Sequence, residues 1–246
     1  MTTPTVAQLS QALTSYGLPP PHPSFLTAIL VPPSNRGLPP FPALVATAKH
    51  RLLNTDLTLP SILEPSAASL PARITDVAFP SRLLAYDVVV QVLGVEDTGR
   101  SRWDQIEALE MERKGETTKG REVIRVVAPE EEPSSASTQA PASTSQNSVE
   151  KSYGPYKLDL QDVRGNMAYG FELQKVAKIG YPPLMSIGCK ILLKKGCKVA
   201  RGMVLLEPGN VVVLGGKIEG LDKMWREGRE KALRDAVGDG SRREGS

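Results

Sequence analysis

The sequence predicts an α+β protein in which a small N-terminal helical bundle precedes a compact β-domain that ends in a helix. Apolar residues recur at helical spacing within residues 1–57, and short apolar runs separated by turn signals follow from residue 73. The chain has 246 residues, of which 40% are hydrophobic and 23% charged, which is enough for one or two modest cores.

Three short amphipathic helices are expected in residues 1–57. In the first, residues 5–16, Thr5 is placed to cap the start and Gly17 to follow the end. Pro23 suits the first turn of the second helix, and the third begins near Phe41. Residues 58–72 are predicted to be an extended linker. The apolar stripes of the three helices predict a shared core of Val6, Leu9, Leu13, Tyr16, Phe25, Leu26, Ile29, Leu30, Leu44, Val45, Ala48 and Leu52.

The β-domain is predicted to span residues 73–238, with a polar tail in residues 239–246. Its first strand lies in YDVVVQVLGVED, residues 86–97, whose near-continuous Val and Leu content indicates burial on both faces. With the later runs this makes five or six strands and a terminal helix, which matches the OB-fold, a five-stranded Greek-key barrel. The later runs, separated by turn signals such as RGN and PGN, are residues 156–163, 166–176, 189–195, 199–207 and 210–216.

A long insertion, residues 97–152, interrupts the barrel after its first strand. Ser101 and Asp104 fit a helix-capping box, and a strand is predicted in REVIRVV, residues 121–127. Residues 129–152 are rich in Ser, Thr, Pro and Glu and are predicted to be disordered. Such a long connection with structure of its own is more often functional than idle. The insertion helix presents one apolar stripe, which either packs on the barrel or anchors a partner: Trp103, Ile106 and Leu109.

The sequence carries no catalytic signature, whether a Walker A loop, an HExxH motif or a G-x-S-x-G motif. Cys189 and Cys197 are expected to be buried thiols, because His22 and His50 lie far away and a zinc site needs about four ligands. We therefore expect no metal or cofactor and no enzyme activity. The first 35 residues contain no Lys or Arg, and no apolar run has the length of a membrane helix, so we expect an intracellular protein without a membrane segment.

The barrel segment is basic, because residues 157–201 contain nine Lys or Arg against three Asp or Glu. OB-folds bind single strands through such charge together with aromatic stacking platforms. Tyr156, Tyr169, Phe171 and Tyr181 are the candidate platforms, although two aromatic residues on one strand face are more often core. A net charge of +3 does not indicate nucleic acid by itself. The candidate nucleic-acid contacts are Lys194, Lys195, Lys198 and Arg201.

Residues 188–221 resemble the signature stretch of the RecQ-mediated genome instability protein 1 family and have the sequence GCKILLKKGCKVARGMVLLEPGNVVVLGGKIEGL. The pattern is Gly-x-Lys-Ile-Leu, then a Gly, then Gly-x-x-Leu-Leu-x-Pro-x-Asn-Val-x-Val-Leu-Gly-Gly. Two further stretches fit the family: YGFEL, with Gly170 and Glu172, and RLLNTDL at residues 51–57. The resemblance covers most of the chain, is loose in the Pro-rich N-terminal region and leaves residues 129–152 unmatched.

The resemblance implies a three-helix bundle followed by an OB-fold, in agreement with the element pattern. It also implies a non-catalytic nuclear subunit that binds type IA topoisomerase III and works with a RecQ helicase. Together they would dissolve double Holliday junctions and promote decatenation, with residues 97–152 as the family's insertion that reaches toward the topoisomerase gate and modulates it. A second OB-fold subunit is a further candidate partner, and the chain alone would bind DNA weakly or not at all.

The resemblance also implies site residues. We expect Lys190, at the family's Gly-x-Lys position, to lie on the topoisomerase-binding surface of the barrel. In the insertion, we expect Trp103, Ile106 and Leu109 to act as anchors with Arg100 and Arg102 beside them. The alternative function is a stand-alone OB-fold protein that binds single-stranded DNA, which would show salt-sensitive binding by the chain alone.

Overall fold

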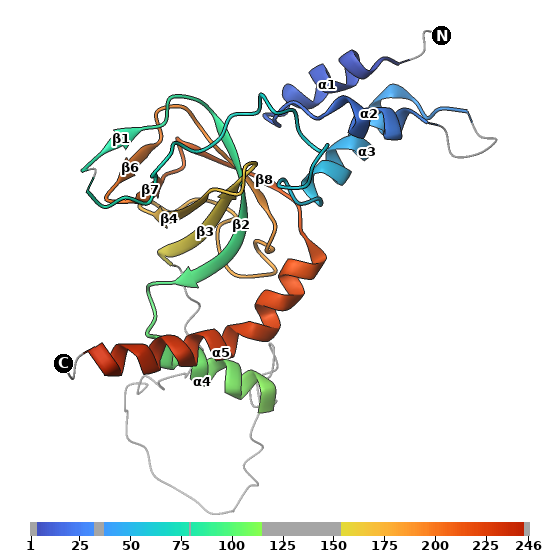
Figure 1. Ribbon diagram of the computed structural model, residues 1–246. Helices are drawn as coiled ribbons and strands as arrows, with labels where there is room; N and C mark the ends of the chain where they lie inside the picture. Colours follow the sequence, from blue (N-terminus) through green and yellow to red (C-terminus); the bar gives the residue numbers. More distant parts are fainter. Residues whose placement is uncertain (1–3, 32–36, 79, 115–153, 244–246) are drawn as a thin grey trace, which may run out of the picture. The chain divides into compact units, whose positions relative to one another are not determined.

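A computed structural model describes residues 4–31, 37–78, 80–114 and 154–243 (Figure 1). The chain forms two compact units. The first comprises residues 1–100 and 153–229, and the second comprises residues 101–152 and 230–246. Among the helices of the described residues, none combines the length and the apolar character needed to cross a membrane.

The first unit begins with the three predicted helices, α1 (Val6–Thr14), α2 (Pro23–Leu30) and α3 (Phe41–Leu53). Thr5 caps α1 through a capping box with Gln8, which satisfies backbone N–H groups that have no partner inside the helix. α2 and α3 both carry Pro in their first turn. The helices enclose a core of Leu9, Leu13, Leu18, Leu26, Ile29, Leu44, Val45, Ala48, Leu52 and Leu53.

Two parts of the predicted bundle differ from expectation. Tyr16 is 52% exposed, because α1 ends at Thr14 and the ring lies beyond the helix, where the Nζ of Lys49 is 4.3 Å from its centroid. Residues 58–72 are more than an extended linker: they contain several turns and an isolated bridge between Leu63 and Pro21, and their apolar side chains pack on both cores of the first unit. The backbone N–H of Leu70 donates a hydrogen bond of 2.8 Å to the buried carboxylate of Asp162, which fastens this segment to the barrel.

The barrel is one curled sheet of mixed pairing, as the OB-fold prediction requires. All its neighbouring strands are antiparallel except β4 and β7, which are parallel. In order across the sheet, the strands are β1 (Arg82–Leu83), β6 (Lys198–Ala200), β7 (Met203–Leu206), β4 (Met167–Glu172), β3 (Tyr156–Asp162), β2 (Val88–Asp97), β5 (Lys190–Leu193) and β8 (Val211–Gly215).

The sheet has more strands than the predicted five or six. The short edge strand β1 has no counterpart among the predicted runs, and the run at residues 199–207 is a hairpin, β6–β7, rather than one strand. The chain reverses at Arg201 and Gly202, whose φ angles are both positive at 50° and 81°. The predicted burial of β2 on both faces is confirmed, since inward Val90 and outward Gln91 are both 0% exposed.

The second unit contains α4 (Arg102–Lys114) and the C-terminal half of α5 (Glu219–Arg243), which lie side by side in Figure 1. Ion pairs join them: Arg234 to Glu110, and Arg113 to Glu230 at 3.5 Å. The helix expected in the insertion is therefore present. The predicted strand at residues 121–127 and the predicted disorder at residues 129–152 lie outside the described residues. α5 extends to Arg243, into the predicted polar tail.

Candidate partner-binding site

The insertion leaves the barrel from a closed stem. The β2–β3 ladder extends to the pair Asp97 and Tyr156, where β2 ends and β3 begins. One residue further on, Thr98 donates two hydrogen bonds to the carbonyl oxygen of Pro155, from its backbone N–H at 2.9 Å and its hydroxyl at 2.6 Å. The chain entering the insertion is thus hydrogen-bonded to the chain leaving it. The β2–β3 ladder is complete up to the pair Asp97 and Tyr156, immediately before this contact.

Two glycines let the stem strands approach closely. A Cβ on Gly99 would lie 2.4 Å from the carbonyl oxygen of Gly154, well inside van der Waals contact. Gly154 has a φ of +80°, and a Cβ there would lie 2.7 Å from a carboxylate oxygen of Glu172. That carboxylate accepts hydrogen bonds from the backbone N–H groups of Tyr156, at 3.2 Å, and Val176, at 2.9 Å. The stem is therefore held in one conformation by close backbone packing and by hydrogen bonds to the barrel.

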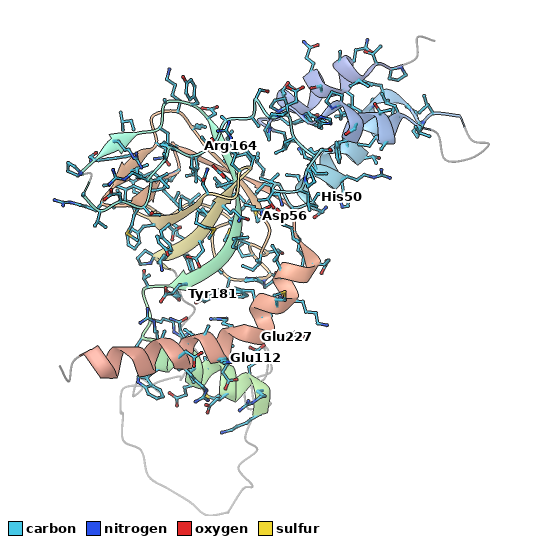
Figure 2. All side chains as sticks on the ribbon, in the orientation of Figure 1. His50, Asp56, Glu112, Arg164, Tyr181 and Glu227 are labelled. Carbon is cyan, nitrogen blue, oxygen red and sulfur yellow. The ribbon has the colours of Figure 1, made fainter. Side chains whose placement is uncertain are left out.

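Tyr181 braces this stem from the side (Figure 2). Its hydroxyl accepts a hydrogen bond of 2.9 Å from the backbone N–H of Asp97. Its ring meets Tyr156 edge to face at 5.7 Å and Trp225 at 6.0 Å, and the guanidinium of Arg229 lies 3.9 Å from its centroid. Burial raises the pKa of Tyr181, which keeps the hydroxyl neutral. Tyr156 and Tyr181 are thus packed in the structure and do not form a stacking platform.

The insertion residues predicted to bind a partner differ in how far they are exposed to solvent. Trp103 is 63% exposed and Arg102 is exposed, while Arg100 and Leu109 are half-buried. Ile106 is only 2% exposed, so it contributes to packing within this chain and is not available as a partner anchor. The helix itself begins as expected, because the Oγ of Ser101 accepts a hydrogen bond of 3.1 Å from the backbone N–H of Asp104.

Lys190 does not lie on the surface, which corrects the sequence prediction. Its side chain is 0% exposed, and its Nζ donates a hydrogen bond of 2.7 Å to the carbonyl oxygen of Gly188. Lys190 faces outward from the barrel, opposite Gln91 on β2 and Gly215 on β8. It is buried because the chain that follows α3 covers this face of the sheet. Burial lowers the pKa of Lys190 to about 8, against the attraction of Asp56.

We call the covered region the polar joint; it consists of Asp56, Leu57, Gln91, Gln161 and Lys190. The amide of Gln91 donates to a carboxylate oxygen of Asp56 at 2.8 Å and to the side-chain oxygen of Gln161 at 2.9 Å. Its own oxygen accepts from the backbone N–H of Leu57 at 3.0 Å. Figure 2 labels Asp56 on the segment after α3. The joint fixes the end of the helical bundle on the barrel through hydrogen bonds of the buried Gln91 side chain.

A second contact between bundle and barrel depends on the double glycine of the signature stretch. A Cβ on Gly216 would lie 2.2 Å from the carbonyl oxygen of Leu53, the last residue of α3. Next to it, the backbone N–H of Lys217 donates a hydrogen bond of 2.8 Å to the side-chain oxygen of Asn54. Gly216 is therefore needed for a close approach of two backbones, and the sequence signal for it was the Gly-Gly dipeptide.

The four predicted nucleic-acid contacts are exposed and lie on β6 and its two turns. Within the part of the chain that the structure describes, none of the four has an ion-pair partner. The Nζ of Lys194 reaches the carbonyl oxygen of Gly209 at 3.4 Å. By contrast, Lys157 and Lys217 are paired with carboxylates. The four free cations are Lys194, Lys195, Lys198 and Arg201.

Cys189 and Cys197 are buried free thiols, as predicted, and burial raises the pKa of each to about 11. Tyr169, in contrast, points outward from β4 and is 43% exposed, with the Nζ of Lys157 at 4.8 Å from its ring centroid. Phe171 is half-buried on the same outer face. The more common arrangement, in which such a pair lies in the core, does not apply here.

Comparison with known proteins identifies relatives of the barrel. Residues 65–229 match the protein-family model described as RMI1, N-terminal OB-fold domain. The RecQ-mediated genome instability protein 1 of Schizosaccharomyces pombe is 30% identical to this chain over 139 residues. That alignment covers 55% of this chain and 58% of the relative, so the chain spans little more than half the length of the relative it matches.

Proposed function

The chain belongs to the RecQ-mediated genome instability protein 1 family, and we propose from this premise that it is a non-catalytic, nuclear subunit of a topoisomerase III–RecQ helicase complex. It binds the topoisomerase and promotes double Holliday junction dissolution and decatenation by modulating the topoisomerase gate. The topoisomerase and the helicase supply the chemistry, and DNA is bound through the complex. A second OB-fold subunit is a further partner in this proposal.

The closed stem is the observation that carries the proposal. The barrel ladder closes at Asp97 and Tyr156, and Thr98 and Pro155 tie the insertion ends together, so the barrel does not use the insertion to complete its own sheet. A segment held this way is available to a partner. The exposed Trp103, with Arg102 next to it, is the kind of residue that dominates interface energetics.

The mechanism proposed is a shift of population. A gate that opens and closes is a two-state element, and a bound protein shifts that equilibrium only if it contacts the two states differently. The stem holds the insertion at a defined point of the barrel, while the barrel holds the topoisomerase. The insertion then contacts one gate state better than the other, which changes decatenation without a catalytic residue in this chain.

The test separates binding from gating. We expect the full chain to bind its cognate topoisomerase III in calorimetry and to change the rate of decatenation. A variant in which residues 101–152 are replaced by a short Gly-Ser linker keeps the stem; it should still bind but lose the effect on decatenation. Trp103→Ala should act in the same direction, and Tyr86→Ala, at a site 72% exposed on the barrel, is the matched control. Absence of binding by the wild-type chain would contradict the proposal.

A stand-alone single-strand-binding protein is the second candidate, favoured by the four exposed cations on β6 and its turns. Anisotropy with a labelled oligothymidine decides it: binding by the chain alone should weaken with salt, with a log–log slope of about −0.7 per phosphate contact. Replacing Lys195, Lys198 and Arg201 by Gln should reduce that slope. If the chain alone shows no salt-dependent binding, this second candidate is rejected.

A further inference from the structure

The insertion helix α4 has an apolar stripe that is covered inside the second unit, where α4 lies beside the C-terminal half of α5 (Figure 1). Ile106 of α4 is 2% exposed and Leu233 of α5 is 8% exposed, yet neither belongs to the two apolar cores of the first unit. Leu109 and Val237, about one turn further along each helix, are half-buried. The stripe of the insertion helix is therefore shielded from solvent within this chain.

Ion pairs join the two helices beside this stripe. Arg234 of α5 pairs with Glu110 of α4 and, at 3.0 Å, with Glu230 on its own helix. Glu230 also pairs with Arg113 of α4 at 3.5 Å. Glu110 and Arg113 follow Ile106 by four and seven positions, which places all three on one face of α4. The four charges alternate in sign through the network, so each helix attracts the other at two successive turns.

This contact is weak enough to be released. The side chains of Arg113 and Arg234 are 65% and 46% exposed, and ion pairs exposed to this degree contribute little each and weaken as salt increases. A helix of 13 residues, such as α4, is marginally stable in water by itself, so it depends on a packing partner. The contact between α4 and α5 therefore has the properties of a two-state element with a held and a released form.

We propose that the C-terminal half of α5 is a releasable clamp, which holds the insertion helix and withholds its apolar stripe from the topoisomerase while the chain is free. Ile106 and Leu109 become available only when α4 leaves α5, whereas the exposed Trp103 is accessible in the held form as well. A partner that binds the stripe competes with α5, so the fraction of chains with an open clamp scales the effect of the insertion. This inference rests on the proposed function and adds a regulatory step to it.

Charge swaps that keep the net charge of the full chain constant test the clamp. Glu110→Arg with Arg113→Glu reverses the α4 side of the network, and Glu230→Arg with Arg234→Glu reverses the α5 side. Either double swap places like charges opposite each other. The quadruple variant, which combines both swaps, restores an attractive pair at each position. All four side chains are at least partly exposed, so circular dichroism should show every variant folded.

Hydrogen exchange of the α4 amides measures release of the clamp without any partner. Both double swaps should speed the exchange of residues 106–114 by about tenfold, because α4 loses its packing partner. The quadruple variant should return to the wild-type rate. The control is Lys223→Glu with Glu227→Lys, which reverses an ion pair of 3.9 Å that lies within α5 alone. Its α4 amides should exchange within about twofold of the wild-type rate.

Decatenation by the cognate topoisomerase III measures the consequence of release, with each variant present at a saturating concentration. Both double swaps should enlarge the change in rate that the chain causes by at least about twofold, because more of the bound chains have an open clamp. The quadruple variant and the control swap should act like the wild type.

The two measurements separate the clamp from the proposed function. If α4 exchange is unchanged in both double swaps, or is not restored in the quadruple variant, the clamp is refuted while the proposed function stands. If exchange responds as expected but the double swaps leave the decatenation effect unchanged or reduce it, α5 does not withhold the stripe, and the inference is overturned. If the wild-type chain neither binds the topoisomerase nor changes decatenation, the proposed function is refuted and the inference is refuted with it.

Discussion

Replacing Lys190 by Met tests whether a buried ammonium group lies in the polar joint. The side chain is 0% exposed, and burial lowers its pKa from 10.5 to about 8. A base with a lower pKa in the fold binds fewer protons there than in the unfolded chain, so the free energy of unfolding increases with pH from about 8 to about 10.5. The difference between the two pKa values, at about 1.4 kcal/mol per pKa unit, corresponds to about 3 kcal/mol.

The Met variant lacks this titration but has similar length. The wild type should therefore gain about 2 to 3 kcal/mol of stability relative to Lys190→Met between pH 7 and pH 10, because most of the titration falls in that interval. The donor to Gly188 changes from an ammonium to an amine as Lys190 titrates, so the change in this hydrogen bond is already part of the pKa difference, whereas the loss of side-chain packing is common to both pH values. Urea denaturation of both proteins at pH 7 and at pH 10 measures this difference in the free energy of unfolding. The exposed Lys195→Met is the control and should show no pH-dependent difference. A flat difference for Lys190→Met would refute a buried, charged lysine.

Three further changes test the stem and the contacts between bundle and barrel, each read from urea denaturation. Gly216→Ala should lower the free energy of unfolding by about 3 kcal/mol or more, because positive-φ strain adds to a backbone clash at the end of α3. Its neighbour Gly215→Ala has similar φ but open space and should cost only about 1 to 2 kcal/mol; equal costs would contradict the close approach. Tyr181→Phe removes the oxygen that accepts the stem N–H and should cost about 1 kcal/mol, with no loss expected if that bond is absent in solution. Gln91→Ala removes three hydrogen bonds of a side chain that is 0% exposed and should cost about 2 to 3 kcal/mol, whereas a cost below about 0.5 kcal/mol would show that the joint is hydrated.

Local signals in the sequence predicted the helices well. The capping box at Thr5 and the Pro at the first turn of α2 act within a few residues of the helix start, so one stretch of chain carries the whole signal. The same is true of Ser101 at the insertion helix. The fate of Lys190 depends on residues 53–58, which cover its face of the sheet from far away in the sequence. The inward–outward alternation of side chains along β5 shows that Lys190 faces out of the barrel but not that another segment covers it. The sequence therefore predicts an exposed lysine.

The orientation of β4 was beyond sequence reasoning for a related reason. Hydrophobicity favours Tyr169 and Phe171 in the core, but the space inside is already filled by Leu160 and Leu206, and only Gly170 fits between them. The space available inside the barrel depends on side chains from several strands, so the sequence of β4 alone does not show which of its residues fit inside. The turn of the β6–β7 hairpin carries a weak sequence signal because it includes Arg201 at positive φ, a conformation that a residue other than Gly rarely adopts.

The closed stem makes the barrel a frame into which other segments can be exchanged. Thr98 and Pro155 are joined by their own hydrogen bonds and not through the chain between them, so that chain can be lengthened, shortened or rewritten without redesigning the barrel. The same frame allows a foreign segment to be placed between these two residues while the barrel keeps its own sheet.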